Sequence, residues 1–190
     1  MLDLVIGSNM KKVLKYGAVS FLLLLLFSFS NPEKKIHKLI KKVWKDVELS
    51  MKQVELEYIP VNITQLNKVF GNNELLGYAC YTYSTGCKVG GCSAPSPEKR
   101  DETYEVFEYI IIYDTNLIIQ KVDIANYGGD YGYEICRPGW LKQFKGKKNG
   151  FELNKNIDGI AGATISATYL IYDINSLSDT LEVLKSKNEI

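Results

Sequence analysis

Hydrophobic residues recur along this chain with two spacings, and each spacing predicts a kind of element. From Glu33 to Glu48 the apolar positions return every three or four residues, which is typical of an amphipathic helix whose other face is rich in lysine. Short apolar runs with partial alternation predict strands where turn residues bound them. The predicted strands cover residues 54–59, 75–83, 104–113 and 117–124.

The last two predicted strands are separated only by Asp114-Thr115-Asn116, which indicates a hairpin. The segment 110–112 is Ile-Ile-Ile and therefore apolar on both faces, so we expect this strand inside the sheet, covered by helices. A short helix capped by Thr64 is predicted over Thr64 to Phe70, followed by a turn at Gly71-Asn72-Asn73.

The C-terminal third predicts a short helix over Pro138 to Lys145 and a closing helix that begins near Thr164. Polar residues at Asp173 and Asn175 suggest a break in the closing helix. Two long loops, 84–102 and 126–134, are rich in glycine. The order of elements predicts an α+β fold, a single domain with an antiparallel or mixed sheet flanked by helices.

The N-terminal 30 residues have the composition of a leader. A basic start at 10–15 precedes an apolar run at 16–29, and small residues at Ser28 and Ser30 favour a secretory signal cut after Ser30. The run is shorter than the roughly 20 residues of a membrane-spanning helix. An uncleaved anchor stays open, because the lysines after the run oppose export of that flank. We therefore divide the chain into a leader at 1–30, a helical and strand extension at 31–75 and a main domain at 76–190.

The net charge of the chain argues against nucleic acid as a partner. The chain has 23 basic and 22 acidic residues among 190, a formal net charge of +1, so no global field attracts nucleic acid. The leader places the protein in the periplasm or on the outer face of the cytoplasmic membrane. Membrane association through the N-terminal segment is an alternative to export in soluble form, and the lysine face of the first helix suits either solvent or anionic lipid headgroups.

Candidate chemistry gathers in the stretch Asp158 to Ser166, which reads Asp-Gly-Ile-Ala-Gly-Ala-Thr-Ile-Ser. Asp-Gly favours a turn, and small residues before Thr164 leave its hydroxyl approachable next to the amides of a helix N-terminus, an arrangement that suits a phosphate. A purely structural interpretation is that Thr164 caps the helix. The stretch resembles the flavinylation motif Asp-x-x-Ser-Gly-Ala-Thr-x-Ser/Thr of the FMN-binding domain family, found in subunits of the Rnf and sodium-pumping NADH:quinone reductase complexes. Ala161 departs from that motif.

The resemblance extends, more weakly, from about Gly77 to the C-terminus. Trp140 to Gly146 is similar to the aromatic-x-x-Gln-Phe-x-Gly stretch that precedes the motif in the family. Where many relatives carry Glu-Thr-Pro-Gly in a loop against the flavin, this chain has the tyrosine-rich loop 127–134. Those tyrosines either stack on a flavin or pack the rim of the domain.

The resemblance implies FMN attached through a phosphoester to Thr164. From the residues themselves we predict no metal site and no catalytic residue, because none looks like an acid or base for a substrate of its own. The resemblance also implies a set of further cofactor-binding residues: Asp158, Gly162, Ala163, Ile165, Ser166, Tyr131, Gly132, Tyr133 and Trp140.

Four cysteines in an exported chain predict two disulfides with three possible connectivities. We favour Cys87 with Cys92 and Cys80 with Cys136. A redox-active Cys87–Cys92 pair that exchanges electrons with the flavin is an alternative. The chain has no Cys-x-x-Cys, which argues against a zinc site, an iron–sulfur cluster or a c-type haem.

Taken together, these features predict an exported flavoprotein that carries electrons. Its expected partners are a flavin transferase for maturation and a redox protein or membrane electron-transfer complex. Two alternatives stay open: a flavin-dependent reductase of an external acceptor, and a non-redox binding or structural domain that holds no flavin.

Overall fold

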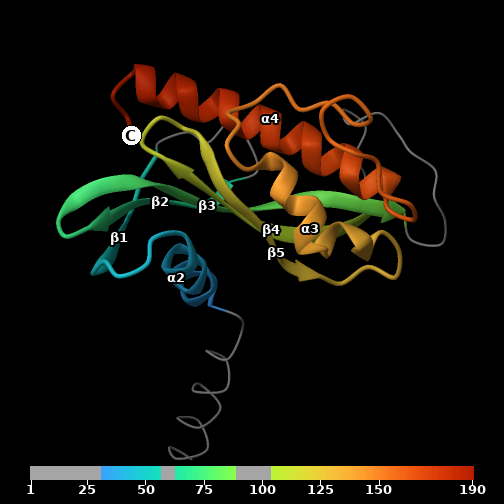
Figure 1. Ribbon diagram of the computed structural model, residues 1–190, viewed down its shortest axis with the longest axis horizontal. Coiled ribbons are helices and arrows are strands. Elements are labelled where there is room, and N and C mark those ends of the chain that lie inside the picture. Colours follow the sequence, from blue (N-terminus) through green and yellow to red (C-terminus); the bar gives the residue numbers. More distant parts are fainter. Residues whose placement is uncertain (1–30, 57–62, 89–103) are drawn as a thin grey trace, which may run out of the picture. The chain divides into compact units, whose positions relative to one another are not determined.

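A five-stranded antiparallel sheet with the strand order β1-β2-β3-β4-β5 organises the fold (Figure 1). The computed structural model describes residues 31–56, 63–88 and 104–190, and the compact unit that carries the sheet spans Lys35–Ile190. The strands are β1 Leu49–Gln53, β2 Ile63–Gly71, β3 Glu74–Lys88, β4 Tyr104–Asp114 and β5 Ile119–Tyr127. The helices are α2 Pro32–Val43, α3 Pro138–Leu141 and α4 Thr164–Ser186, with short 3₁₀ turns η1 Tyr133–Cys136 and η2 Lys142–Phe144. The predicted α+β class is confirmed, and the sheet is purely antiparallel.

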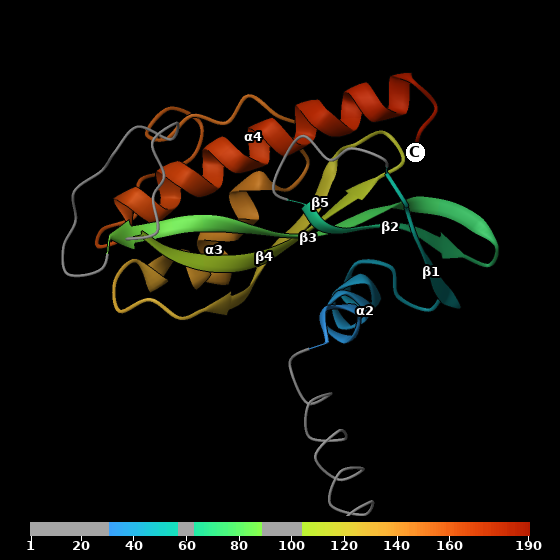
Figure 2. The ribbon, with the colours of Figure 1, turned by 180° about the vertical axis from the view of Figure 1, so that it is seen from behind.

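Helices cover both faces of the sheet. Figures 1 and 2 show α4 and α3 on one side of the strands and α2 on the other. On the inner strand β4, Ile111 belongs to the core under α4, while Ile110 and Ile112 belong to the core under α2. This alternation explains why the strand is apolar on both faces, and it confirms the predicted inner position.

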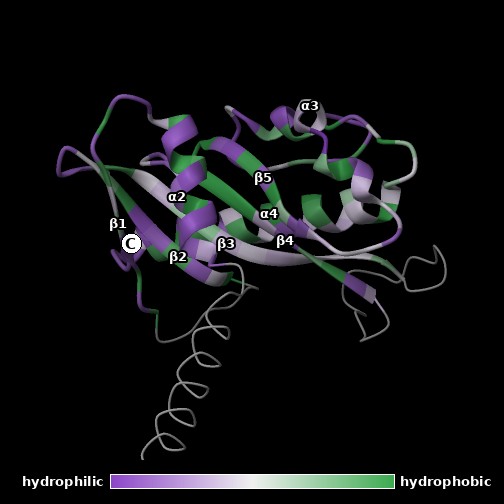
Figure 3. Cartoon of the chain, turned by 90° about the horizontal axis from the view of Figure 1, so that it is seen from below, coloured by the Kyte–Doolittle hydropathy of each residue, from purple (hydrophilic) through white to green (hydrophobic). Residues whose placement is uncertain are grey.

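The first helix lies against the sheet by one apolar face. Ile36, Leu39 and Ile40 are buried against the sheet, and Figure 3 shows hydrophilic residues on the outer side of α2. The helix ends at Val43 rather than at the predicted Glu48. The backbone then turns at Asp46, whose φ of 59° lies in the left-handed region and is incompatible with a continuing right-handed helix.

Two local predictions in the N-terminal part are wrong. Residues 64–70 form part of β2 rather than a helix, and the strand predicted over 54–59 lies earlier, as β1 over Leu49–Gln53. The apolar spacing in β2 fits a helix locally, but its side chains serve both faces of the sheet. Leu66 joins the core under α4 and Val69 the core under α2. Residues 57–62 lie outside the described part of the chain.

The turns predicted at residues 71–73 and 114–116 are both present, and each joins two strands. Asn72 and Asn73 have φ of 50° and 69°, the left-handed pair that a tight hairpin between β2 and β3 requires. In the β4–β5 hairpin, Oδ1 of Asp114 accepts hydrogen bonds from the backbone N–H groups of Asn116 (2.8 Å) and Ile118 (3.0 Å). The Asp114 carboxylate thereby supplies the acceptor that these two backbone N–H groups would otherwise lack within the turn.

The predicted extension at 31–75 and the predicted main domain share one sheet, since β2 pairs with β3 along its length. The strand predicted over 75–83 continues to Lys88, so the predicted loop at 84–102 begins as strand, and its remainder lies among residues 89–103, outside the described residues. The predicted leader at 1–30 also lies outside them. Among the residues described, no helix is long and apolar enough to span a bilayer.

The closing helix α4 runs unbroken over 23 residues, contrary to the break suggested by its polar residues. Asn175 turns its side chain to the neighbouring loop, where it accepts from the Phe151 N–H and donates to the Phe151 carbonyl, both at 2.9 Å. Asp173 accepts a hydrogen bond from the Ser84 hydroxyl of β3. These polar residues therefore fasten the helix to its surroundings rather than ending it.

Candidate functional site

The stretch Asp158 to Ser166 forms a tight turn that leads into α4. Gly162 has φ of 82°, a left-handed conformation that favours glycine, and the Ala163 N–H donates to the Ile160 carbonyl at 3.3 Å. Ala163 is the N-cap of the helix and supplies no side-chain hydrogen bond. The first amides of a 23-residue helix are therefore left without a capping side chain, and they favour negative charge near them.

Thr164 is the first helical residue and not the cap, so the purely structural interpretation of its hydroxyl does not hold. The residue is exposed, and within the described part of the chain its Oγ1 has no hydrogen-bond partner. The Thr164 carbonyl accepts a 2.8 Å hydrogen bond from the hydroxyl of Thr168, which lies one helical turn later. The hydroxyl is thus open beside uncapped amides.

The tyrosine-rich loop closes over the first turn of α4. The hydroxyls of Tyr127 and Ser166 lie 3.0 Å apart, and the Tyr127 hydroxyl also donates to the Tyr131 carbonyl. Gly132 has φ of 85°, and a Cβ there would lie 2.3 Å from Ser166 Oγ and 2.7 Å from the Tyr127 hydroxyl. Only glycine fits this approach. Burial raises the pKa of Tyr127 to about 12, so the phenol stays a neutral donor near neutral pH.

The stretch Trp140 to Gly146 holds the other end of the turn. Trp140 Nε1 donates to the Asp158 carbonyl at 2.8 Å, and Gln143 Oε1 accepts from the Asp158 N–H at 2.8 Å. Edge-to-face contacts from Trp140 to Phe144 and from Phe144 to Phe151 fix this segment in the core. The two stretches that carry the family resemblance are therefore bound to each other directly.

Glu134 was not predicted as a site residue, yet its carboxylate lies over the turn. A Cβ at Gly162 would lie 3.0 Å from Glu134 Oε1 and 3.4 Å from Oε2. Oε2 is buried and finds no hydrogen-bond partner in the described residues, and the same holds for Glu105 Oε2, which lies against Gly129 of the same loop. A buried acceptor without a donor is uncommon in folded proteins. Tyr127, Glu134 and Gln143 lie in stretches that the sequence analysis named, but they were not predicted as site residues because each acts through contacts distant in sequence.

The remaining predicted site residues differ in how they are placed. Gly132 and Ser166 meet, as described above, and Ala163 is buried at the start of α4. Tyr131 and Tyr133 are 53% and 58% exposed, more than any other aromatic residue in the described part of the chain. Ile165 is half-buried and Asp158 is exposed. The structure thus leaves aromatic surface open on the loop that touches the motif.

The structure tests one of the two predicted cysteine pairings. Cys80 is buried in β3 and Cys136 is half-buried in η1, and both are free thiols, so the favoured pairing of these two is absent. Burial raises the pKa of both thiols, and for Cys136 the carboxylates of Asp123 and Glu134 raise it further. Cys87 is buried, while Cys92 lies outside the described residues, so a Cys87–Cys92 pair stays a prediction.

Comparison with known proteins adds no assignment. No protein-family model matches this chain, and no curated protein matches it. Within the described ranges, no three histidine, cysteine or acidic side chains gather as metal ligands.

Proposed function

We propose that this protein is an exported flavoprotein that holds FMN covalently on Thr164 and carries electrons to or from a redox partner. The observation that carries the proposal is the open Thr164 hydroxyl at the uncapped N-terminus of α4, inside a stretch that resembles a flavinylation motif. The leader of the sequence adds a reason for a covalent bond, because a flavin bound only reversibly is hard to replace outside the cytoplasm.

The residues around Thr164 fit the group that the resemblance implies. A phosphodiester on Thr164 carries one negative charge, and uncapped amides at a helix N-terminus stabilise such a charge by about 0.3–1 kcal/mol at an exposed site. The partnerless Glu134 Oε2 supplies an acceptor near the turn, and the ribityl hydroxyls of FMN are donors. Tyr131 and Tyr133 offer exposed aromatic area for a flat ring.

Attachment requires one bond to form and one to break. Thr164 Oγ1 bonds to the phosphorus of an activated FMN donor, the bond from that phosphorus to the donor's leaving group breaks, and the hydroxyl proton passes to a base. The described residues around Thr164 include no histidine, so we assign this base to the partner flavin transferase. The single histidine, His37, belongs to α2, on the opposite face of the sheet from α4.

Electron carriage is favoured over turnover of a small substrate. FMN supplies redox chemistry in one- or two-electron steps when it is bound. Turnover of a small substrate would need a placed acid or base. The described contacts around Thr164 instead hold the turn and the loop, since Trp140 and Gln143 bind Asp158 and Tyr127 contacts Ser166. Electron exchange with a redox protein or a membrane electron-transfer complex needs no such group.

The test is co-expression of the full chain with a flavin transferase. We expect wild type to gain the mass of one FMN less one water and to fluoresce in a denaturing gel. Thr164→Val should stay unlabelled, and Thr164→Ser should retain labelling because it keeps the hydroxyl. The matched control is Thr168→Val, which removes a hydroxyl one turn away and should be labelled as wild type. Unlabelled wild type, or labelled Thr164→Val, contradicts the proposal.

A second measurement separates the carrier from a reductase. Reduced, labelled protein should pass its electrons to a redox protein in a single event, with no sustained consumption of a small-molecule acceptor. Sustained turnover of such an acceptor without a protein partner would identify a reductase instead.

A further inference from the structure

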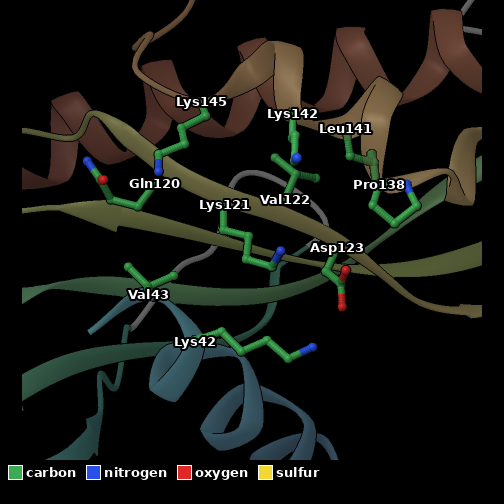
Figure 4. Close-up of a pocket in the computed structure, with 10 residues that line it drawn as sticks. All are labelled: Lys42, Val43, Gln120, Lys121, Val122, Asp123, Pro138, Leu141, Lys142 and Lys145. Atoms are coloured by element: carbon green, nitrogen blue, oxygen red, sulfur yellow. The ribbon is translucent and has the colours of Figure 1, made fainter. Parts of the chain in front are cut away.

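A pocket with a strongly basic lining lies at the β5 edge of the sheet, away from the Thr164 turn. Its volume is about 230 Å³, and three parts of the fold contribute its walls. Figure 4 shows Lys42 entering from α2 on one side, Lys121 and Asp123 from β5 in the middle, and Lys142 and Lys145 from the η2 segment on the other side. The remaining lining residues are Val43, Gln120, Val122, Pro138 and Leu141.

The charges of this pocket are not balanced. Four lysines and one aspartate give 4 − 1 = +3. None of the four ammonium groups forms an ion pair with a described carboxylate. Other lysines of the same protein do find such partners, including Lys35 with Glu108 at 4.0 Å and Lys148 with Glu182 at 3.8 Å. Like charges gathered around one depression repel, and an anion bound among them relieves that repulsion.

Protection of an open sheet edge does not explain the whole cluster. Lysines on an edge strand do discourage pairing with other chains, and β5 is an edge strand. That role accounts for Lys121, which lies on the strand. It does not account for Lys42, Lys142 and Lys145, which reach the same pocket from other elements.

The lining also indicates the kind of anion. Lysine ammonium groups act as point charges that bind phosphate well, and a net charge of +3 suits a multiply charged group. Val43, Val122 and Leu141 add apolar area for a carbon substituent, while the Gln120 amide nitrogen is already bonded to Asp114 Oδ2 and the Ile118 carbonyl. The volume is below the roughly 300–1,000 Å³ of typical small-molecule sites, so the ligand is small.

We propose that this pocket is a binding site for a phosphate group on a small organic substituent. It involves none of the residues assigned to FMN and stands independently of that function. Two sources share this chemistry: a soluble phosphorylated metabolite and the headgroup of an anionic phospholipid. A phospholipid is relevant because the sequence has an apolar leader only a few residues before α2.

The test measures binding to the full chain in two arms. In the first arm, pyrophosphate is titrated calorimetrically at low and at physiological salt. In the second, vesicles of phosphatidylglycerol are compared with vesicles of phosphatidylcholine, and binding is expressed as the difference, which removes any contribution common to both. The pocket variant is Lys121→Gln with Lys142→Gln. Its charge-matched control is Lys52→Gln with Lys187→Gln, two exposed lysines outside the pocket.

We expect the pocket variant to lose at least about tenfold in affinity, and the control to stay within about twofold, because contacts to charged groups contribute that much each. Loss in the pyrophosphate arm identifies a soluble phosphate as the source, and loss confined to the vesicle arm identifies a lipid headgroup. Asp123→Asn, which removes the one carboxylate, should tighten binding in the same arm, a gain of function that a misfolded variant does not give. Equal loss in pocket variant and control, or no binding in either arm, overturns the proposal.

Discussion

Gly162 is the position where the geometry of the candidate site can be tested most directly, by replacement with alanine. The residue has φ of 82°, and an L side chain in that region costs about 1–2 kcal/mol. An added Cβ also lies 3.0 Å from Glu134 Oε1, which must move by a few tenths of an ångström. For a chain of 190 residues, a loss of about 1–2 kcal/mol lowers Tm by roughly 2–8 °C.

Gly150 provides a matched control. Its φ of 77° is nearly the same, but a Cβ there meets nothing within 4 Å. Alanine restricts the unfolded chain equally at both positions, which offsets about 0.4–1 kcal/mol in each variant. The difference between Gly162→Ala and Gly150→Ala in the free energy of unfolding therefore measures the contact with Glu134. Urea denaturation of both variants gives this difference.

The contact can be isolated by a double-mutant cycle. In a Glu134→Ala background, Gly162→Ala should cost no more than Gly150→Ala, because the neighbouring carboxylate is gone. Labelling by the flavin transferase should fall in Gly162→Ala and stay at the wild-type level in Gly150→Ala. If Gly162→Ala is as stable as wild type, the left-handed turn before α4 is wrong, and with it the account of why the motif needs glycine there.

Three further outcomes are expected elsewhere. Trp140→Phe keeps an aromatic ring in the core but leaves the Asp158 carbonyl without its 2.8 Å donor. The free energy of unfolding in urea should therefore fall by about 0.5–1.5 kcal/mol, and flavin labelling should decrease. Unchanged labelling would mean that the Trp140–Asp158 hydrogen bond does not support the site. Asn175→Ala removes both hydrogen bonds to Phe151 and should cost about 1–3 kcal/mol in the same assay, whereas no loss would mean that the loop is held by packing alone. Burial raises the pKa of Tyr127 from about 10 to about 12, so its contribution to stability is complete below about pH 10 and is lost as the pH rises through about 12. If Tyr127→Phe lowers the phenolate absorbance of the folded protein at pH 10 by the amount of one tyrosine, then Tyr127 ionises at that pH and this shift is contradicted.

The spacing of apolar and polar residues predicted correctly those elements that contact a single surface along their whole length. The apolar face of α2 repeats with helical spacing and lies on one surface of the sheet, so spacing and burial agree. The Asn72-Asn73 turn is encoded by residues that tolerate positive φ. Thr164 was expected near the start of the closing helix, and it is the first helical residue of α4.

The spacing of apolar residues gave a wrong prediction where a segment has side chains on both faces of the sheet. In β2, Leu66 and Val69 are three residues apart, as on one face of a helix, yet they belong to opposite cores. The segment is a strand because it pairs with β1 on one side and β3 on the other, and no local window contains either partner. Asp173 and Asn175 suggested a break in α4 for a related reason. Their hydrogen-bond partners, Ser84 and Phe151, lie elsewhere in the chain, so the sequence around the helix does not reveal them.

The stretch Asp158 to Ser166 was recognisable from the sequence alone, because turn residues, small residues and a hydroxyl follow one another in it. What surrounds that stretch was decided only by the tertiary structure. Tyr127 against Ser166, Glu134 against Gly162, and Trp140 with Gln143 against Asp158 join segments between 15 and 39 residues apart. The lysine pocket joins α2, β5 and η2 in the same way. A site made of such contacts depends on how the sheet brings its loops and helices together, which spacing along the chain does not encode.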